Sequence, residues 1–303
     1  MRSNNVLGFI FAATLDDKIP ELASSRTTAS VPIGGKYRII DFDLSNMSNS
    51  GISNVGIVAK SNFQSLMDHV GSGSAYDLSK RRSNLSILPP YDGKAFSSFV
   101  ETIYNMHGYI EHCREEYVLI SQGNVITNID YTDVFDFHSK KKADITLIYK
   151  NHAIPQGYDR PITLDVDNDG KVNQIFVKPG VVDKGVFNHA YGSILIKKDL
   201  LMSEIRNAIS VNQLDVRRLI QSSLGKYSIY AYENKGYCAA ISSINDYFEF
   251  NMDLMKKEVR DELFNPQRPI YTKVRDDAPS RYGLTSNVKN SIIAQGCVIN
   301  GEV

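Results

Sequence analysis

The sequence predicts an α/β fold, a mixed but mostly parallel sheet covered by helices, followed by a smaller repeat domain. Apolar runs of strand length alternate with stretches of helical apolar spacing through most of the chain. From Asn287 onward the residues fall into six-residue units, NVKNSI, IAQGCV and INGEV, with Ser291, Cys297 and Val303 at one position. This period predicts the start of a left-handed parallel β-helix.

The composition places the chain among ordinary globular proteins. Of its 303 residues, 42% are hydrophobic and 22% are charged, and 34 basic side chains balance 34 acidic ones. A balanced charge gives no support for nucleic acid or an anionic membrane as partner. Three widely spaced cysteines fit neither a disulfide framework nor a zinc site, so we expect a cytoplasmic protein. No apolar run is long enough to span a bilayer.

The sequence predicts strands and helices that alternate along the chain. Residues 6–12 form a nearly continuous apolar run, which predicts a buried parallel strand, and residues 54–60 predict a second one. Residues 62–70 have helical spacing, and the Gly, Ser and Pro content of 71–95 predicts a long loop. Further strands are expected at 117–121, 144–149, 189–197, 227–232 and 236–241, and further helices at 99–113, 199–224 and 245–256. The acidic residues 165–170, DVDNDG, predict a hairpin turn.

These elements divide into domains. Residues 1–258 form the α/β domain, and 259–284 are expected to be a linker because they contain three prolines and no apolar period. Residues 285–303 begin the β-helix. One or two coils cannot bury a core, so we expect this part to be the truncated start of a longer domain.

The segment 31–52, VPIGGKYRIIDFDLSNMSNSGI, carries the most specific motif. It resembles the GGK-[YF]-RIIDF-x-LSN-x-x-NSGI signature of the sugar-nucleotide pyrophosphorylases. The likeness is greatest to the ADP-glucose pyrophosphorylase (glucose-1-phosphate adenylyltransferase) family, and within it to the divergent GlgD-type regulatory subunits. The resemblance implies a Rossmann-like nucleotidyltransferase domain. It also implies a parent reaction in which ATP and glucose-1-phosphate give ADP-glucose and pyrophosphate, with Mg²⁺ as cofactor.

The family's phosphate-binding loop is altered in this chain. By alignment with the family, Ala13 and Thr14 replace two glycines, Asp16 replaces the third, and Thr28 replaces a lysine. Glycines there let backbone N–H groups approach the triphosphate. Asp16 and Asp17 would instead repel it, at about 3 kcal/mol for one charge pair at roughly 5 Å. We therefore expect the loop to be unfit to hold ATP for catalysis.

The family's two metal-binding aspartates are also replaced. The first position, in the segment that resembles the family's S-G-D motif, is Asn124, and the second is Ala240. Hard divalent cations prefer anionic oxygen ligands, so we expect no metal cofactor and no catalytic residue of its own at these degenerate positions.

The resemblance leaves a set of weak ligand-binding candidates. They are Lys18, Arg26, Lys36, Arg38, Gly123 and Lys178. Lys178 matches the family lysine that contacts the sugar phosphate, while Val177 replaces the glutamate that contacts the sugar. A surface lysine before a turn proline is an equally good interpretation of Lys178.

We therefore expect a regulatory, catalytically impaired subunit in bacterial glycogen biosynthesis. The resemblance implies a heterotetramer with a catalytic ADP-glucose pyrophosphorylase subunit, and a sugar phosphate or nucleotide as possible effector. Two alternatives stay open at this point. One is an active adenylyltransferase with altered ligands, and the other is a stand-alone sugar-nucleotide sensor.

Overall fold

A computed structural model describes residues 3–12, 19–60, 62–79, 83–89, 98–153, 161–177, 185–274 and 276–303 of the chain. Several residues that the sequence analysis singled out lie outside these ranges. They are Ala13, Thr14, Asp16, Asp17, Lys18 and Lys178.

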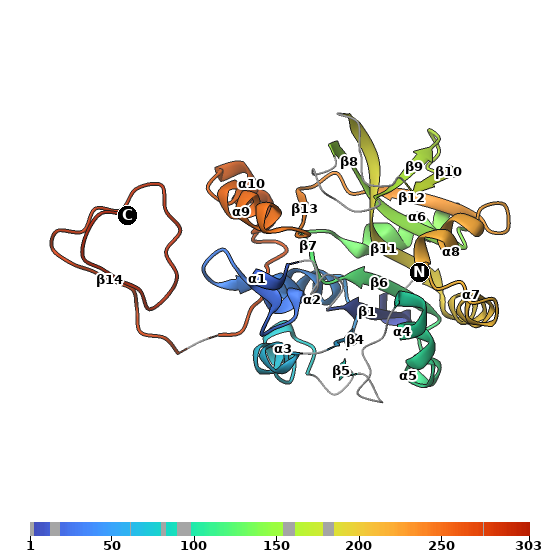
Figure 1. Cartoon of the computed structure of the whole chain (residues 1–303), viewed down its shortest axis with the longest axis horizontal. Coiled ribbons are helices and arrows are strands. Elements are labelled where there is room, and N and C mark those ends of the chain that lie inside the picture. Colours follow the sequence, from blue (N-terminus) through green and yellow to red (C-terminus); the bar gives the residue numbers. More distant parts are fainter. Residues whose placement is uncertain are drawn as a thin grey trace.

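A nine-stranded mixed sheet runs through the molecule (Figure 1). Strands β5, β4, β1 and β6 are parallel neighbours, and β11 joins β6 antiparallel. Beyond β11 lie the antiparallel β9–β10 hairpin and β8, which pairs in parallel with β12. The strands span Val6–Phe11 (β1), Asn54–Val58 (β4), Asn84–Leu88 (β5), Tyr117–Gln122 (β6), Ile145–Ala153 (β8), Ile162–Val166 (β9), Val172–Val177 (β10), Val186–Lys197 (β11) and Ile229–Glu233 (β12).

Helices cover both faces of the sheet, each over its own apolar core. One core contains side chains of α4 (Phe99–Asn105), α5 (His107–His112) and α7 (Lys198–Ser210), with α8 (Val216–Ser222) packed against it. The other contains side chains of α2 (Ile39–Asn49), α3 (Gln64–Val70) and α6 (Tyr131–Lys141). All six residues of β1 are buried, as a central strand covered on both faces requires. None of the helices in the described ranges is long and apolar enough to cross a membrane.

A third, smaller core lies beside the sheet. It contains side chains of α1 (Pro20–Ala23), α2, α9 (Ile244–Asp253) and α10 (Lys257–Leu263), together with the β2–β3 hairpin (Pro32–Ile33 and Tyr37–Arg38). Tyr37 stacks on Phe264 with 5.0 Å between the ring centroids. This packing fixes the GGK motif against the end of the α/β domain. A separate two-stranded sheet, β7 (Val125–Thr127) with β13 (Cys238–Ala240), lies next to it.

Most of the predicted elements are confirmed, and some are wrong in detail. The predicted hairpin at 165–170 joins β9 to β10. The predicted helix 99–113 is divided at Met106 into α4 and α5. The predicted loop 71–95 contains β5, which extends the parallel sheet beside β4 and buries Leu88. The Gly and Ser content of the segment obscured this short strand. The predicted linker 259–284 starts inside α10.

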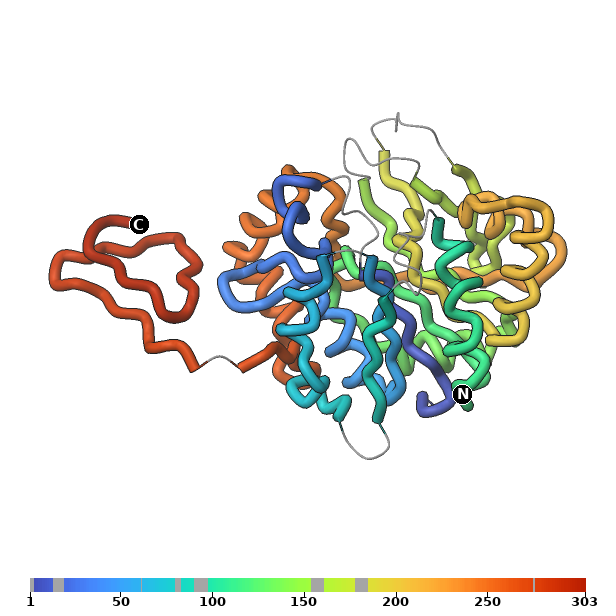
Figure 2. Tube along the Cα trace, turned by 60° about the horizontal axis from the view of Figure 1, so that its bottom comes forward, coloured from blue at the N-terminus to red at the C-terminus, as the bar shows by residue number. Residues whose placement is uncertain are grey.

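The C-terminal segment lies at one end of the molecule in both views (Figures 1 and 2). Its strands β14 (Arg281–Tyr282) and β15 (Val298–Ile299) pair in parallel, and Asn287 forms a parallel bridge with Glu302. The chain therefore returns alongside itself in the same direction. Assignment of this turn to a left-handed β-helix stays a prediction.

Candidate functional site

The site begins where β1 and β6 end side by side. The Gly123 N–H, directly after β6, donates to the carbonyl oxygen of Phe11 at 2.8 Å. A Cβ atom at Gly123 would come within 2.9 Å of that oxygen and 3.1 Å of the Ala12 Cα atom. Only glycine allows this close approach. Gly123 thus has a structural reason to be glycine, and its role toward a ligand stays a prediction.

Asn124 and Ala240, at the two positions where the family resemblance implies metal-binding aspartates, lie together. The antiparallel β7–β13 pair joins Val125 to Ala240. One residue further along, the Ile241 N–H donates to the Asn124 backbone oxygen at 2.9 Å, and the Asn124 side-chain amide donates to the Ile241 carbonyl oxygen at 3.2 Å. The structure therefore brings together two positions that the sequence separates by more than a hundred residues, as the family resemblance implies.

The residues at this point do not fit a magnesium ion. Asn124 is neutral, and its Nδ2 group is already used within the protein. Its Oδ1 atom is buried and has no hydrogen-bond partner, so it supplies one neutral oxygen where an octahedral ion needs several ligands, carboxylates among them. Ala240 supplies none. In the described parts of the chain, no three His, Cys, Asp or Glu side chains gather as metal ligands.

Apolar and neutral groups surround position 240 instead. Ala240, Val125 and Tyr191 form a small buried cluster, with Cys238 packed against it. The Tyr191 hydroxyl is hydrogen-bonded to His152 Nε2, and the His189 ring lies 4.5 Å from the Tyr191 ring. Together with the two histidines, these residues come from β7, β8, β11 and β13, so four separate segments close the space beside position 240.

Burial keeps these groups uncharged. Burial, followed by the neighbouring His152, lowers the pKa of His189 to about 3. Burial, followed by the charge of Lys150, also lowers the pKa of His152. For the Cys238 thiol, burial is the largest cause and raises the pKa to about 12. The described side chains at position 240 therefore carry no anion at pH 7 that could attract a divalent cation.

The GGK motif forms a tight hairpin. Gly34 and Gly35 have positive φ angles of 56° and 69°, which favour glycine. The Gly34 N–H donates to Asn251 Oδ1 of α9 at 3.2 Å. Lys36 is exposed and its ammonium lies 5.6 Å from the centre of the Tyr37 ring. An exposed lysine on a fixed hairpin can bind an anion, and this role stays a prediction.

The remaining described candidates are two arginines. Arg38 Nη1 donates to the backbone oxygen and to Oγ of Ser65, both at 2.7 Å, so its guanidinium holds the start of α3. Arg26 is half-buried in the turn after α1. Whether either arginine also binds a ligand stays a prediction.

Much of the family motif serves the fold. Asp41 is fully buried at the start of α2, and its carboxylate contacts Arg38, His69 and Tyr76. The Arg38 backbone N–H donates to it at 2.8 Å, and the Tyr76 hydroxyl at 2.6 Å. His69 Nε2 lies 2.6 Å from the same carboxylate. This part of the family motif thus anchors the start of α2.

The sequence analysis missed Tyr191 and Gln122 as parts of the site. Gly192 has a φ of 85° at a bulge in β11, and a Cβ atom there would clash with the Gln122 side chain. A glycine inside a strand pattern often marks such a bulge or a close approach. Gly192 inside a predicted strand could therefore have indicated that another side chain, here that of Gln122, packs closely against β11 at this point.

Comparison with protein families agrees with this fold and motif. The family model described as "Nucleotidyl transferase" matches residues 17–257. The chain is 30% identical to the glycogen biosynthesis protein GlgD of Bacillus subtilis, over 100% of this chain and 79% of that protein. It is 36% identical to GlgD of Geobacillus stearothermophilus, over 99% of this chain and 78% of that protein.

Similarity extends to a relative named as an adenylyltransferase and to a solved structure. A glucose-1-phosphate adenylyltransferase of Clostridium acetobutylicum is 30% identical over 100% of this chain and 81% of that protein. The crystal structure of a putative glucose-1-phosphate thymidylyltransferase from Bacillus anthracis superposes on this chain with a TM-score of 0.67 at 13% sequence identity. It covers 86% of this chain and 98% of that one, which shows the shared fold. The resemblance inferred from the motif is confirmed.

Proposed function

The chain belongs to the nucleotidyl transferase family, and from this premise we propose that it is a regulatory, catalytically impaired subunit of a glucose-1-phosphate adenylyltransferase in glycogen biosynthesis. Its partner would be a catalytic homologue, in a heterotetramer. The relatives named GlgD and glucose-1-phosphate adenylyltransferase support the pathway.

The observation that carries the proposal is the meeting of Asn124 and Ala240 across the β7–β13 pair. Nucleotidyl transfer depends on positioning and on neutralising phosphate charge, and divalent cations held by carboxylates provide much of that neutralisation. Here one position is a neutral amide and the other is a methyl group beside Tyr191 and Val125. The chain thus has the family fold but no carboxylate at positions 124 and 240. This combination supports a role in binding an effector and in assembling with a catalytic subunit.

Retained cations support an anionic effector. Lys36 is exposed on the GGK hairpin and Arg26 is half-buried nearby in sequence. A sugar phosphate or nucleotide held by these groups would bind without being turned over. By linkage, an effector that binds one state of the assembly more tightly shifts the affinity of the catalytic subunit for its substrates.

The decisive experiment measures ADP-glucose formation by the chain alone, by a homologue with both metal aspartates, and by the two mixed. We expect the chain alone to turn over at less than about a thousandth of the homologue's rate, because the charge stabilisation is missing. In the mixture we expect co-elution as one larger species. We also expect the homologue's kcat or substrate half-saturation to change by about threefold or more.

Two results would favour the alternatives. Ordinary turnover by the chain alone, abolished by Asn124→Ala, would identify an active adenylyltransferase with altered ligands. Binding of a sugar nucleotide with no co-elution and no effect on the homologue would identify a stand-alone sensor.

A further inference from the structure

Helix α2 lies between two segments that are far apart in the sequence. One is the connection from β7 to α6, and the other is residues 268–273, which lead from α10 toward the C-terminal segment. Residues 45–50 of the helix and its C-cap, SNMSNS, belong to the family motif, and the proposed function uses none of their side chains. Four of these six side chains are hydrogen-bonded to one of the two segments.

Ser45 and Asn49, one helical turn apart, hold residues 268–273. The Tyr271 N–H donates to Ser45 Oγ at 2.8 Å, and Asn49 Nδ2 donates to the Pro269 carbonyl oxygen at 3.0 Å. Side chains at positions i and i+4 lie on one side of a helix, so both contacts come from the same side of α2. The described residues between α10 and β14 form no helix or strand, so side-chain contacts such as these fix the path of the chain.

Asn46 and Ser50 hold the connection from β7 to α6. Asn46 Nδ2 donates to the Thr127 carbonyl oxygen at 2.8 Å, and its Oδ1 accepts from the Ile129 N–H at 3.2 Å. Ser50 Oγ, directly after the helix, accepts from the Tyr131 N–H at 2.9 Å. Asn46 and Ser50 are 1% and 2% exposed. Two neighbouring rows of polar side chains on α2 thus hold two different segments.

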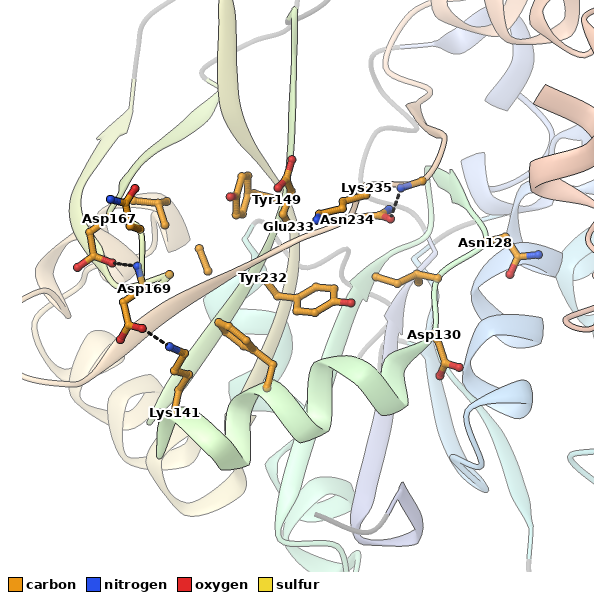
Figure 3. Close-up of a pocket in the computed structure, with 17 residues that line it drawn as sticks. Asn128, Asp130, Lys141, Tyr149, Asp167, Asp169, Tyr232, Glu233, Asn234 and Lys235 are labelled. Atoms are coloured by element: carbon orange, nitrogen blue, oxygen red, sulfur yellow. Dashed lines mark hydrogen bonds and ion pairs between the residues drawn. The ribbon is translucent and has the colours of Figure 1, made fainter. Parts of the chain in front are cut away.

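The connection from β7 to α6 is bonded in turn to the segment before β13. The Thr127 hydroxyl donates to the Tyr237 carbonyl oxygen at 2.8 Å and accepts from Asn234 Nδ2 at 2.8 Å. The two segments meet at the cavity shown in Figure 3, where Asn234 and Asp130 are labelled. A displacement of this connection would therefore move the β7–β13 pair, which carries Ala240.

Arg268 joins the two segments directly. Its guanidinium donates to the Ile129 carbonyl oxygen at 2.7 Å and to Ser50 Oγ at 3.3 Å, and it lies 2.6 Å from the Asp130 carboxylate. Release of residues 268–273 would break these contacts and expose Ile270, which is 8% exposed in the structure. The held arrangement of this segment therefore depends on the same residues that position the connection after β7.

We propose that α2 couples the position of residues 268–273 to the geometry of the β7–β13 pair, with Ser45, Asn46 and Asn49 as positioning residues. A rigid helix with hydrogen bonds to both segments can transmit a displacement of one to the other. A partner that moves the C-terminal segment would thereby change the surroundings of position 240. This regulatory use of the coupling rests on the proposed function, whereas the coupling itself is a property of the chain alone.

Hydrogen exchange of the chain alone, followed by mass spectrometry, tests the coupling. Ser45→Ala with Asn49→Ala removes the contacts to residues 268–273 and keeps Asn46. We expect exchange to become about threefold or more faster in residues 268–273, and also in 125–129 and 238–241. Because coupling is reciprocal, Asn46→Ala should in turn speed exchange in residues 268–273. Ser48→Ala, at a half-buried serine of the same helix, is the matched control and should change neither segment.

Helix α7 reports any general loss of stability, because it packs in a different core from α2. The proposal is overturned if each variant affects only the segment that it contacts, or if exchange in α7 accelerates as much as in the distant segment. Should either variant fail to fold, Ser45→Ala alone, which removes one hydroxyl group, decides the outcome.

Activity in the mixture with a catalytic homologue tests the regulatory use separately. We expect the double variant to co-elute with the homologue and to lose the change in kcat or half-saturation that the parent chain causes. Equal modulation by parent and double variant would contradict the regulatory use of α2. If the exchange of the two segments is coupled and the parent itself has no effect on the homologue, the coupling is supported and the proposed function fails.

Discussion

Asp43 is a carboxyl group buried in the middle of α2. It is 3% exposed, and the Ser121 hydroxyl donates to its Oδ1 at 2.5 Å while Oδ2 has no hydrogen-bond partner. Burial raises its pKa from 3.8 to about 7, and the hydrogen bond from Ser121 opposes this only in part. At neutral pH this residue therefore carries a substantial burial cost.

Asp43 should make stability depend on pH. Because the folded pKa is raised, its favourable contribution is complete below pH 3.8 and is lost as the pH rises toward 7. We expect the unfolding free energy to fall by about 1.4 kcal/mol per pH unit in this window. Asp43→Asn should remove that slope in urea denaturation at several pH values. Asp136→Asn, at an exposed site, should retain it.

Asp41 should be among the most sensitive residues of the GGK motif. Its carboxylate caps α2 and accepts from the Tyr76 hydroxyl. We expect Asp41→Ala to cost about 3 kcal/mol or more, because buried donors are left unpaired. Tyr76→Phe, which removes one hydrogen bond and keeps the ring, should cost about 1 to 2 kcal/mol. Equal stability of Asp41→Ala and the parent in chemical denaturation would show that the capping network is dispensable.

At the scale of elements, packing around the β7–β13 pair determines which side chains can replace Ala240 without loss of stability. Ala240 lies against Val125 and Tyr191, 5% exposed. Ala240→Asp would bury a carboxylate in this apolar cluster, so we expect a loss of about 2 to 4 kcal/mol at pH 7 that becomes smaller at low pH. Ala240→Asn controls for size without charge. If both variants lose equal stability at every pH, charge is not the cause.

Restoring the metal aspartates should not restore the enzyme. Asn124→Asp with Ala240→Asp supplies both carboxylates, yet the altered phosphate loop stays in place. We expect turnover to remain at least about a hundredfold below that of a catalytic homologue unless Asp16, Asp17 and Thr28 are also reverted. ADP-glucose formation measures this. Vigorous turnover by the double variant would show that the loop matters little.

At the scale of the whole molecule, Arg268 ties the segment after α10 to the α/β domain. Its guanidinium pairs with Asp130 at 2.6 Å and donates to the Ile129 oxygen at 2.7 Å. Burial acts to raise the pKa of Asp130, but hydrogen bonds from Thr132 and the charge of Arg268 outweigh it and lower that pKa. This contact therefore stabilises the fold most at pH values above 3.8, the ordinary pKa of Asp130.

Arg268→Met should cost about 2 kcal/mol near neutral pH, because Asp130 loses its counter-charge and Ile129 its donor. The cost should shrink as the pH falls and Asp130 becomes protonated. Lys257→Met, which breaks an exposed pair with Asp261, is the control and should leave stability nearly unchanged, because solvent screens such a pair. Stability is measured by thermal and urea denaturation. If the two variants lose the same amount of unfolding free energy, the proposed role of Arg268 is contradicted.

The sequence by itself predicted most of the strand and helix pattern and showed the GGK motif. It also has Asn124 and Ala240 where the family resemblance implies aspartates, because these features depend on local spacing and residue identity. It misassigned β5 and the start of α10, where composition obscured short elements. Only the tertiary structure decided which residues meet. Asn124 and Ile241 are 117 residues apart and join through strand pairing. The cluster around Tyr191 likewise depends on packing between distant segments, which no local pattern encodes.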